Sequence, residues 1–439
     1  MDGFDELNYD LRDEVERQLL LVQRDFPNAV VVVSSRPDQR FSTWQSYYVF
    51  DVEPLDEDQI RKLIDSFEYP LAIKKRFLKE VEGRLLKTHK SFLSSPLLAS
   101  IMLLTYKEYA EIPEKMNAFY DRAFDTLFQR HDAQKDQYKR KRYTSLQRED
   151  FKSLFSTFCA MSYLDRKISF DEKDFSKFTS LAIKYNSKEN PSIKKTDADK
   201  FSKDLIESVC MLKYDGLDVT FVHRSFQEYF AANFVSGLRG SKVRKFLDAY
   251  AERLNDSVIP MAAEMSRSIV EEFWIVPTLD DTIEIFDDYL RRGDWVSAFS
   301  KIYPRLYLSL DEKGVVNVTG MGLTVDYFSR SQYIDNIYRD RSGLLSDFIF
   351  LTGRVSFSDL VKDAANNKKR MELISYLNRE RSGNGGGFLD EFNEEDSWWL
   401  EKFDIREKCE TFLERAKILR KEIGARLKSS DKILDEFFD

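Results

Sequence analysis

The first residues of the chain carry three carboxylates within five positions: Asp2, Asp5 and Glu6. Carboxylate oxygens are the ligands that a hard cation such as Mg²⁺ prefers, and a carboxylate can also orient or deprotonate a water molecule. The same residues suit the start of a helix, where acidic side chains accept hydrogen bonds from backbone N–H groups. Both interpretations can hold together for Asp5 and Glu6.

A second polar group, Ser34-Ser-Arg36, directly follows the four consecutive valines Val30–Val33. Such a run predicts a strand buried on both faces, as in a parallel sheet covered by helices, and the charged amphipathic segment 8–25 is predicted to be the crossover helix. Ligands bind beyond the carboxyl ends of parallel strands. We therefore expect Ser34-Ser-Arg36 at the ligand edge, with Asp2 at the end of a preceding strand that lies outside the printed sequence.

These segments resemble motifs of one protein family. Asp2-Gly-Phe-Asp-Glu-Leu7 resembles the extended Walker B motif of the NACHT group of signalling NTPases, in the STAND class, and Ser34-Ser-Arg-Pro37 is similar to their sensor 1 motif. The spacing of about thirty residues is what one strand–helix–strand step requires. Ser94–Leu104 is similar to the proline-led helix of the family's small helical domain, and Phe221–Ala232 to the end of its winged-helix domain. The resemblance covers roughly residues 1–240.

The resemblance implies roles for the residues near the N-terminus. Asp2 would hold Mg²⁺ directly or through water, while Asp5 and Glu6 would orient and deprotonate the attacking water. Arg36 would lie near the γ-phosphate and respond to its presence. A surface arginine before a proline turn is the other interpretation of Arg36.

The resemblance also implies two nucleotide contacts farther along the chain. Pro96 would lie against the adenine, and His223 would touch the β-phosphate of ADP and so hold the winged helix in the closed, resting state. The alternative for His223 is a histidine whose hydrogen bonds are satisfied at the start of a helix.

A phosphate-binding loop of the form G-x-x-x-x-G-K-[ST] does not occur in the printed sequence. The glycine cluster Gly383–Gly387 lacks a following Lys-Ser/Thr and is predicted to be a flexible linker. We therefore expect that the chain alone does not hydrolyse ATP. The Walker A segment and any effector domain are expected upstream or in another polypeptide.

The fold class expected from these patterns is mainly α, with a partial α/β P-loop NTPase sheet at the N-terminus, a helical lid, a winged helix and a C-terminal helical domain. The expected domains are the C-terminal part of a NACHT nucleotide-binding domain (1–53), a helical lid (54–134), a winged helix (143–240), a helical sensor-like domain (241–382) and a C-terminal amphipathic helical segment (388–439).

Several local elements can be predicted as well. They are a strand at Tyr47–Val52, a helix opening near Pro54, a lid helix with a buried stripe from Met116 to Phe128, a hairpin within Val209–Val222 that turns at Asp215-Gly216, core anchors at Phe273–Val276 and Trp295, and a long amphipathic helix from Ile405 to Leu427. The last helix must bury its apolar face, and docking on the chain's own helical domain is favoured over a contact with another molecule.

Composition limits the function further. The chain has 439 residues, 68 Lys and Arg against 76 Asp and Glu, and a net charge of −8, which argues against a general polyanion binder. The basic run Lys135–Arg142 is therefore expected to be a solvated loop, with a nucleic-acid contact as the alternative. Three scattered cysteines and no apolar stretch of membrane-spanning length predict a cytoplasmic protein without a disulfide framework.

Together these patterns predict the switch portion of a NACHT ATPase that couples ADP/ATP exchange to opening and homo-oligomerisation in defence signalling, with a trigger that the sequence does not identify. The alternatives are a non-enzymatic regulatory or scaffold protein that has lost its phosphate loop, and a winged-helix DNA binder.

Overall fold

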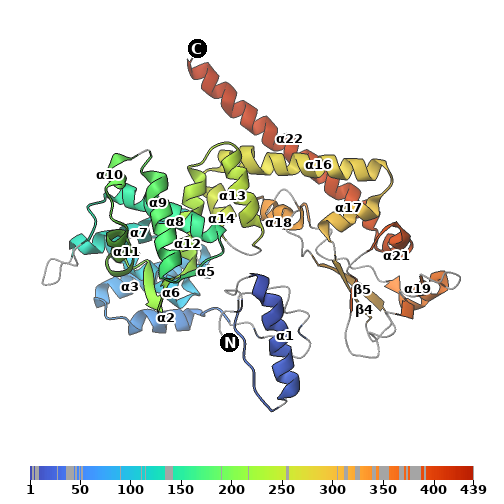
Figure 1. Ribbon diagram of the computed structural model, residues 1–439, viewed down its shortest axis with the longest axis horizontal. Coiled ribbons are helices and arrows are strands. Elements are labelled where there is room, and N and C mark those ends of the chain that lie inside the picture. The colour runs from blue at the N-terminus through green and yellow to red at the C-terminus, as the bar shows by residue number, and fades with distance from the viewer. Residues whose placement is uncertain are drawn as a thin grey trace. The chain divides into compact units, whose positions relative to one another are not determined.

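The computed structural model of the chain is mainly helical (Figure 1). It describes residues 1, 4, 9–26, 28–35, 44, 47–48, 50, 53–88, 90–109, 111–113, 115–133, 142–188, 190–215, 217–253, 257–303, 305–310, 315–321, 327–338, 343–345, 355–364, 370–371, 374–375, 387–389 and 392–438. The chain divides into two compact units: Met1–Ser34 with Tyr47–Phe234, and Ser35–Ser46 with Val235–Asp439.

The first unit contains the helices α1 (Tyr9–Asp25), α2 (Glu57–Ser66), α3 (Leu71–Glu80), η3 (Val81–Leu85), α4 (Leu86–Thr88), α5 (Lys90–Leu93), α6 (Pro96–Tyr109), α7 (Met116–Ala133), α8 (Arg148–Leu164), α9 (Glu172–Asn186), α10 (Pro191–Lys194), α11 (Ala198–Lys203), η4 (Asp204–Ser208) and most of α12 (Arg224–Ser236). The segment 8–25, predicted as a crossover helix, is helical as α1.

The start of α2 shows how the sequence fixes a helix boundary. Asp56 is the N-cap: its side chain accepts a hydrogen bond from the backbone of Gln59, whose side chain accepts one from the Asp56 backbone in return. Glu57 and Asp58 place negative charge at the positive end of the helix dipole. The helix predicted to open near Pro54 is therefore confirmed.

A three-stranded antiparallel sheet follows α8 in the first unit. Its strands β1 (Ser169–Phe170), β2 (Leu212–Asp215) and β3 (Asp218–Phe221) lie in the order β1-β3-β2. The predicted hairpin is confirmed, but Asp215 is the last paired residue of β2, opposite Asp218, so the two-residue loop begins one residue later than the predicted Asp215-Gly216 turn. Gly216 itself lies outside the described residues. The sheet packs through buried Phe170 and Phe221 on Phe158 of α8.

The second unit contains α13 (Ser241–Ala251), α14 (Val258–Met265), α15 (Arg267–Val270), η5 (Glu271–Ile275), α16 (Val276–Arg291), α17 (Trp295–Ile302), α18 (Tyr327–Ile337), α19 (Phe357–Ala364), η6 (Glu394–Asp396), α21 (Ser397–Leu400), η7 (Glu401–Phe403) and α22 (Ile405–Phe438). Trp274, Ile275 and Trp295 are buried, as predicted for core anchors.

The second unit also contains an antiparallel sheet that the sequence analysis missed. Its strands β4 (Arg305–Leu310), β5 (Val315–Met321), β6 (Val355–Ser356) and β7 (Gly387–Leu389) lie in the order β6-β5-β4-β7. Gly387, predicted to be part of a linker, belongs to β7, while residues 383–386 lie outside the described part. An entirely helical region after residue 240 was therefore a wrong prediction.

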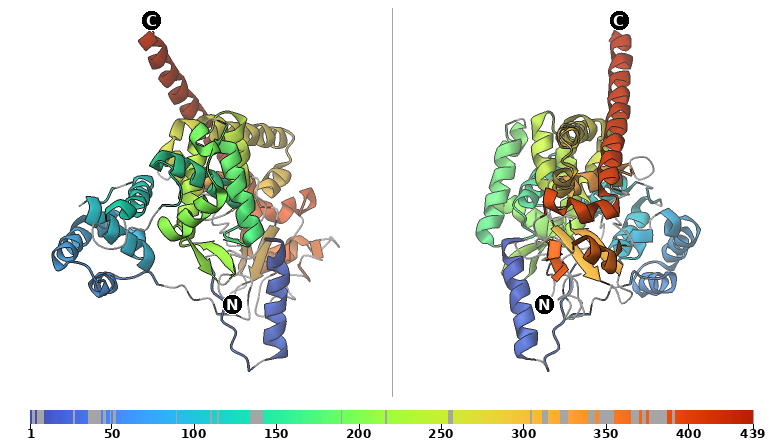
Figure 2. Two further views of the ribbon diagram at one scale, coloured as in Figure 1. Left: turned by 60° about the vertical axis from the view of Figure 1, so that its left-hand side comes forward. Right: turned by 90° about the vertical axis from the view of Figure 1, so that its right-hand side faces the viewer.

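The long helix α22 docks on α16 of its own unit, as predicted. The ring centroids of Phe286 and Phe412 lie 4.9 Å apart, and Arg420 donates two hydrogen bonds to Asp280, at 2.6 and 3.1 Å. Both views in Figure 2 show the C-terminal turns of α22 extending past the other helices of this unit. The apolar face from Cys409 to Ile423 is thus covered within the chain.

Two predictions for the N-terminal region are wrong. The valine run is not buried on both faces, since Val30 is 90% and Val32 71% exposed. The described residues of the segment 47–52 form no strand, and Tyr48 and Phe50 are exposed. Burial of a strand on two faces requires helices that cover it, and the described residues do not provide such cover for Val30 and Val32.

Candidate functional site

Met1 lies beside the segment Val32–Ser34. The Met1 ammonium group donates a hydrogen bond to the Val32 carbonyl at 2.7 Å, and the Ser34 N–H donates one to the Met1 carbonyl at 2.9 Å. In parallel pairing, one residue forms hydrogen bonds with two residues of the adjacent segment that are two positions apart, as Met1 does with Val32 and Ser34. The Phe4 N–H also donates to the Ser34 carbonyl at 2.9 Å, so both Met1 and Phe4 lie beside Ser34.

Four predicted site residues, Asp2, Asp5, Glu6 and Arg36, lie outside the described residues. The positions of their side chains, and with them the Mg²⁺ and water contacts, stay predictions.

Pro96 is the first residue of α6 and is exposed. Proline suits this position because the first turn of a helix leaves its N–H groups without intrahelical partners. Just before it, the Ser94 carbonyl accepts a hydrogen bond from Leu55 at 3.0 Å and ties α6 to the entry of α2. The following turns are strongly apolar and bury Ala99, Met102 and Leu103.

His223 caps the N-terminus of α12, immediately after β3. Its Nδ1 accepts a hydrogen bond from the Ser225 N–H at 3.2 Å and lies 2.5 Å from the Ser225 hydroxyl. Because Nδ1 acts as an acceptor, the neutral ring carries its proton on Nε2, which is then a donor. A donor at the positive end of a 13-residue helix suits an anionic oxygen.

Two buried polar side chains fix the first turns of α12. The Gln227 amide donates to the Ser162 hydroxyl at 3.0 Å and to the Lys167 carbonyl at 2.8 Å, which ties α12 to the end of α8. Buried Glu228 pairs with Arg224 at 3.2 Å. These contacts hold the backbone that carries His223.

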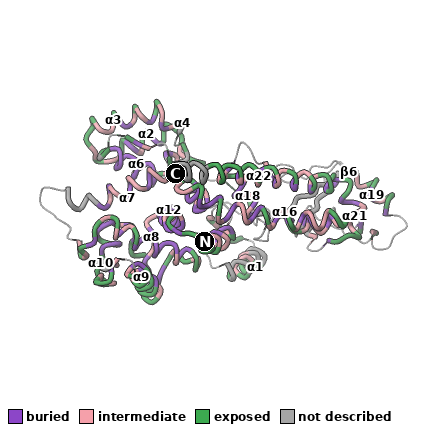
Figure 3. The backbone as a smooth tube through the Cα atoms, turned by 90° about the horizontal axis from the view of Figure 1, so that it is seen from above, coloured by how far each residue is buried: buried purple, intermediate pink, exposed green. Residues whose placement is uncertain are grey.

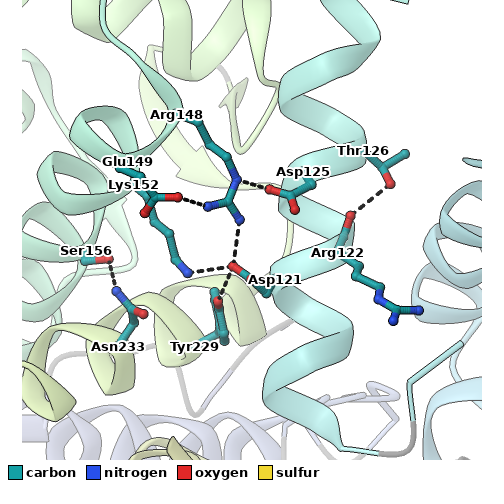
Figure 4. Close-up of polar contacts among 10 residues, drawn as sticks. All are labelled: Asp121, Arg122, Asp125, Thr126, Arg148, Glu149, Lys152, Ser156, Tyr229 and Asn233. Atoms are coloured by element: carbon teal, nitrogen blue, oxygen red, sulfur yellow. Dashed lines mark hydrogen bonds and ion pairs between the residues drawn. The ribbon is translucent and has the colours of Figure 1, made fainter. Parts of the chain in front are cut away.

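The sequence analysis missed a polar network that joins α7, α8 and α12 (Figure 4). Asp121 of α7 accepts hydrogen bonds from Lys152 at 2.5 Å, from Arg148 at 3.0 Å and from the Tyr229 hydroxyl at 3.1 Å. Arg148 also pairs with Asp125, one turn farther along α7. A sequence signal existed: α7 and α8 each carry two like charges four residues apart, which repel in isolation and complement each other across the two helices.

The pKa values of the two carboxylates in this network are shifted in opposite directions. Burial alone would raise the pKa of Asp121, but the hydrogen bond and charge of Lys152, helped by Arg148 and Tyr229, hold that pKa below its ordinary value. Burial also raises the pKa of Asp125, and Arg148 offsets this effect only in part. Burial beside Asp121 raises the pKa of Tyr229, so its hydroxyl stays a donor.

Aromatic rings of the same three helices pack against one another. The ring centroid of Tyr120 in α7 lies 5.4 Å from that of Tyr229 in α12, and the centroid of Phe124 lies 5.3 Å from that of Phe230. Phe128 stands 5.4 Å from Phe151 of α8. A fully buried side chain of this size contributes about 1.5–3 kcal/mol, whereas a partly exposed ion pair contributes about 1 kcal/mol or less, so the rings dominate this joint.

Comparison with models of known protein families gave no match, and comparison with curated proteins gave none either. Among the described residues, no group of three or more His, Cys, Asp or Glu side chains could hold a metal ion. No helix in the same part of the chain is long and apolar enough to cross a membrane.

Proposed function

We propose that this chain is the switch portion of a NACHT-type STAND ATPase, in which ADP/ATP exchange controls opening and homo-oligomerisation in defence signalling. The observation that carries the proposal is the parallel backbone pairing of Met1 with Val32 and Ser34 across α1. Residues 1 and 28–35 are not assigned to a strand, but pairing of this kind on the two sides of a helix supports the strand–helix–strand step that a Walker B and a sensor 1 motif require.

The geometry of His223 supports the same proposal. His223 lies at the positive end of the α12 dipole, a place that would stabilise a phosphate of ADP. In the proposal, Pro96 of the lid and His223 of the winged helix contact the nucleotide, and Asp2 holds its Mg²⁺. Exchange of ADP for ATP supplies a γ-phosphate, and its presence changes the preferred packing of the domains.

The order of elements from α8 to α12 also supports the proposal. A helix, a short strand, further helices and a hairpin follow one another, and the sheet order is β1-β3-β2. This is the order of a winged helix, and the proposal assigns that module to residues 143–240. The lid, residues 54–134, then corresponds to α2–α7.

The charges of this module argue against DNA binding. In a winged helix that binds DNA, the helix before the hairpin enters the major groove. Here that stretch, α11 with η4, exposes Asp199 and Glu207 against Lys200 and Lys203, while Asp204 is buried. Its exposed charges balance and leave no excess positive charge to attract the phosphate backbone, so the winged-helix DNA binder is not supported.

A regulatory or scaffold protein without ATPase activity is the second candidate. The observation that favours it is the lack of a G-x-x-x-x-G-K-[ST] loop in the printed sequence. Both candidates predict that the purified chain alone shows no Mg²⁺-dependent ATP turnover above background. A turnover that is lost in Asp5→Ala or Glu6→Ala would contradict both.

Co-purification with the polypeptide encoded immediately upstream separates the two candidates. The ATPase proposal expects that polypeptide to carry the glycine-rich loop with Lys-Ser/Thr, and the complex to retain ADP through purification. An upstream sequence without the loop, or a stable complex that holds no nucleotide, would contradict the proposal and favour the scaffold.

A further inference from the structure

The helix α7 is shared between two sets of neighbours. Toward α6 it packs along the neighbouring helix, and Arg122 adds a partly exposed pair with Glu111, just after α6, at 3.8 Å and a stacking contact with the Tyr109 ring at 5.5 Å. Toward α8 and α12 it presents Tyr120, Phe124 and Phe128, one turn apart and all buried. Its second face thus has the character of a protein core.

The rings of this second face interlock with both partner helices. Phe124 lies 6.3 Å from Phe151 of α8 and 5.3 Å from Phe230 of α12, and Tyr120 lies 5.4 Å from Phe226. Truncating one such ring to alanine changes an unfolding equilibrium by more than about 100-fold. Three rings that act together therefore resist separation of α7 from α8 and α12 strongly.

The ionic network at the rim of this joint acts differently. The side chains of Asp121, Asp125, Arg148 and Lys152 are between 13% and 39% exposed. Removing an ion pair with this exposure changes an equilibrium by about fivefold or less. The two carboxylates of α7 face the two cations of α8, so a shift of one helix along the other would separate these pairs. The charges therefore select one register of the two helices.

We propose that α7 is a fixed part of the α8–α12 body, and that the ionic network sets the register of this joint rather than serving as a catch that opens. This fixed joint does not rest on the proposed function.

Native-state hydrogen exchange of the 439-residue chain, followed by mass spectrometry in rising urea, tests the proposal without any nucleotide. Peptides from α7, α8 and α12 are expected to open in one cooperative step, with rates that converge as urea rises. Opening of α7 at least tenfold faster than α8 and α12 in the unmodified chain would overturn the proposal.

Two variants sharpen this test. Arg148→Met is expected to raise exchange in α7, α8 and α12 together, by about two- to tenfold, and Phe124→Leu by about tenfold or more in the same three helices. The control Lys177→Met removes an exposed ion pair with Asp165 of the same unit and is expected to change these rates less than twofold. Faster exchange of α7 alone in Arg148→Met would identify the network as a catch and overturn the proposal.

Salt gives an independent measurement on the unmodified chain. Raising NaCl from 50 mM to 1 M is expected to change α7 exchange by less than about threefold, because salt screens the rim and leaves the buried rings in contact. An increase of tenfold or more, confined to α7, would contradict the fixed joint. Neither result depends on whether the chain binds ADP.

Discussion

The N-terminal segment, residues 1–50, and the α7–α8–α12 joint differ in the burial of their apolar residues. Figure 3 colours most of α12 as buried, whereas no described residue of α1 is buried. In the joint, Phe124 and Phe151 are fully buried. In the N-terminal segment Phe4 is also buried, but Val30, Val32 and Phe50 are exposed. The proposed function predicts this contrast, because it assigns the segment to part of a larger sheet.

Truncation of one apolar residue in each region should give the largest difference. Phe124→Ala is expected to lower the free energy of unfolding of the first unit by about 3–5 kcal/mol, because it leaves a cavity among buried rings. Val32→Ala is expected to change it by about 0.5 kcal/mol or less, as for an exposed position. Urea unfolding followed by far-ultraviolet circular dichroism measures both. A loss of more than about 2 kcal/mol in Val32→Ala would remove the contrast.

The polar rim of the joint should give an intermediate effect. Arg148→Met leaves the half-buried carboxylates of Asp121 and Asp125 without their shared partner, and it is expected to lower the free energy of unfolding by about 1 kcal/mol. The control Lys177→Met, in an exposed pair, should cost about 0.5 kcal/mol or less. Equal costs in the two variants would show that the network adds nothing beyond a surface pair.

The smallest effect concerns the pH dependence of the two carboxylates. Because the pKa of Asp121 is lowered on folding, its contribution is complete above the ordinary value of 3.8 and is lost as the pH falls through the lowered pKa. Asp121→Asn should therefore cost about 1 kcal/mol at pH 7, and the difference from the unmodified chain should vanish in acid.

The pKa of Asp125 is raised instead, so its contribution is present below 3.8 and is lost as the pH rises through the raised pKa. Asp125→Asn should then cost less than Asp121→Asn at pH 7, with a pH slope of the opposite sign. Urea unfolding between pH 3 and pH 7 measures both slopes. Slopes of the same sign would contradict this account of the network.

Features governed by local chemistry could be predicted from the sequence. The capping residues Asp56 and Gln59 fix the start of α2, and Asp215 closes the two-residue hairpin, because these boundaries depend on side chains a few positions apart. The docking of α22 followed from an apolar stripe that had to be buried. None of these predictions required knowledge of distant contacts.

Features that depend on distant partners could not be predicted in the same way. The valine run has the composition of a buried strand, yet Val30 and Val32 are exposed, because burial depends on what packs against a segment rather than on the segment itself. The Asp121–Arg148 network forms between helices joined by a linker, and only its like-charge spacing is visible in the sequence. The hairpin β4–β5 does have a local signal in the sequence, because the alternation of Leu306, Leu308 and Leu310 is typical of a strand.

The most direct measurement of the central claim is the dissociation rate of ADP from the complex of this chain with the polypeptide that carries the phosphate loop. His223→Ala removes the donor at the start of α12, and it is expected to speed ADP release by about 10- to 100-fold, the effect of losing a hydrogen bond to a charged group. Lys177→Met, the matched control, should leave the rate unchanged. An unchanged rate in His223→Ala would contradict the assignment of this end of α12 to the nucleotide.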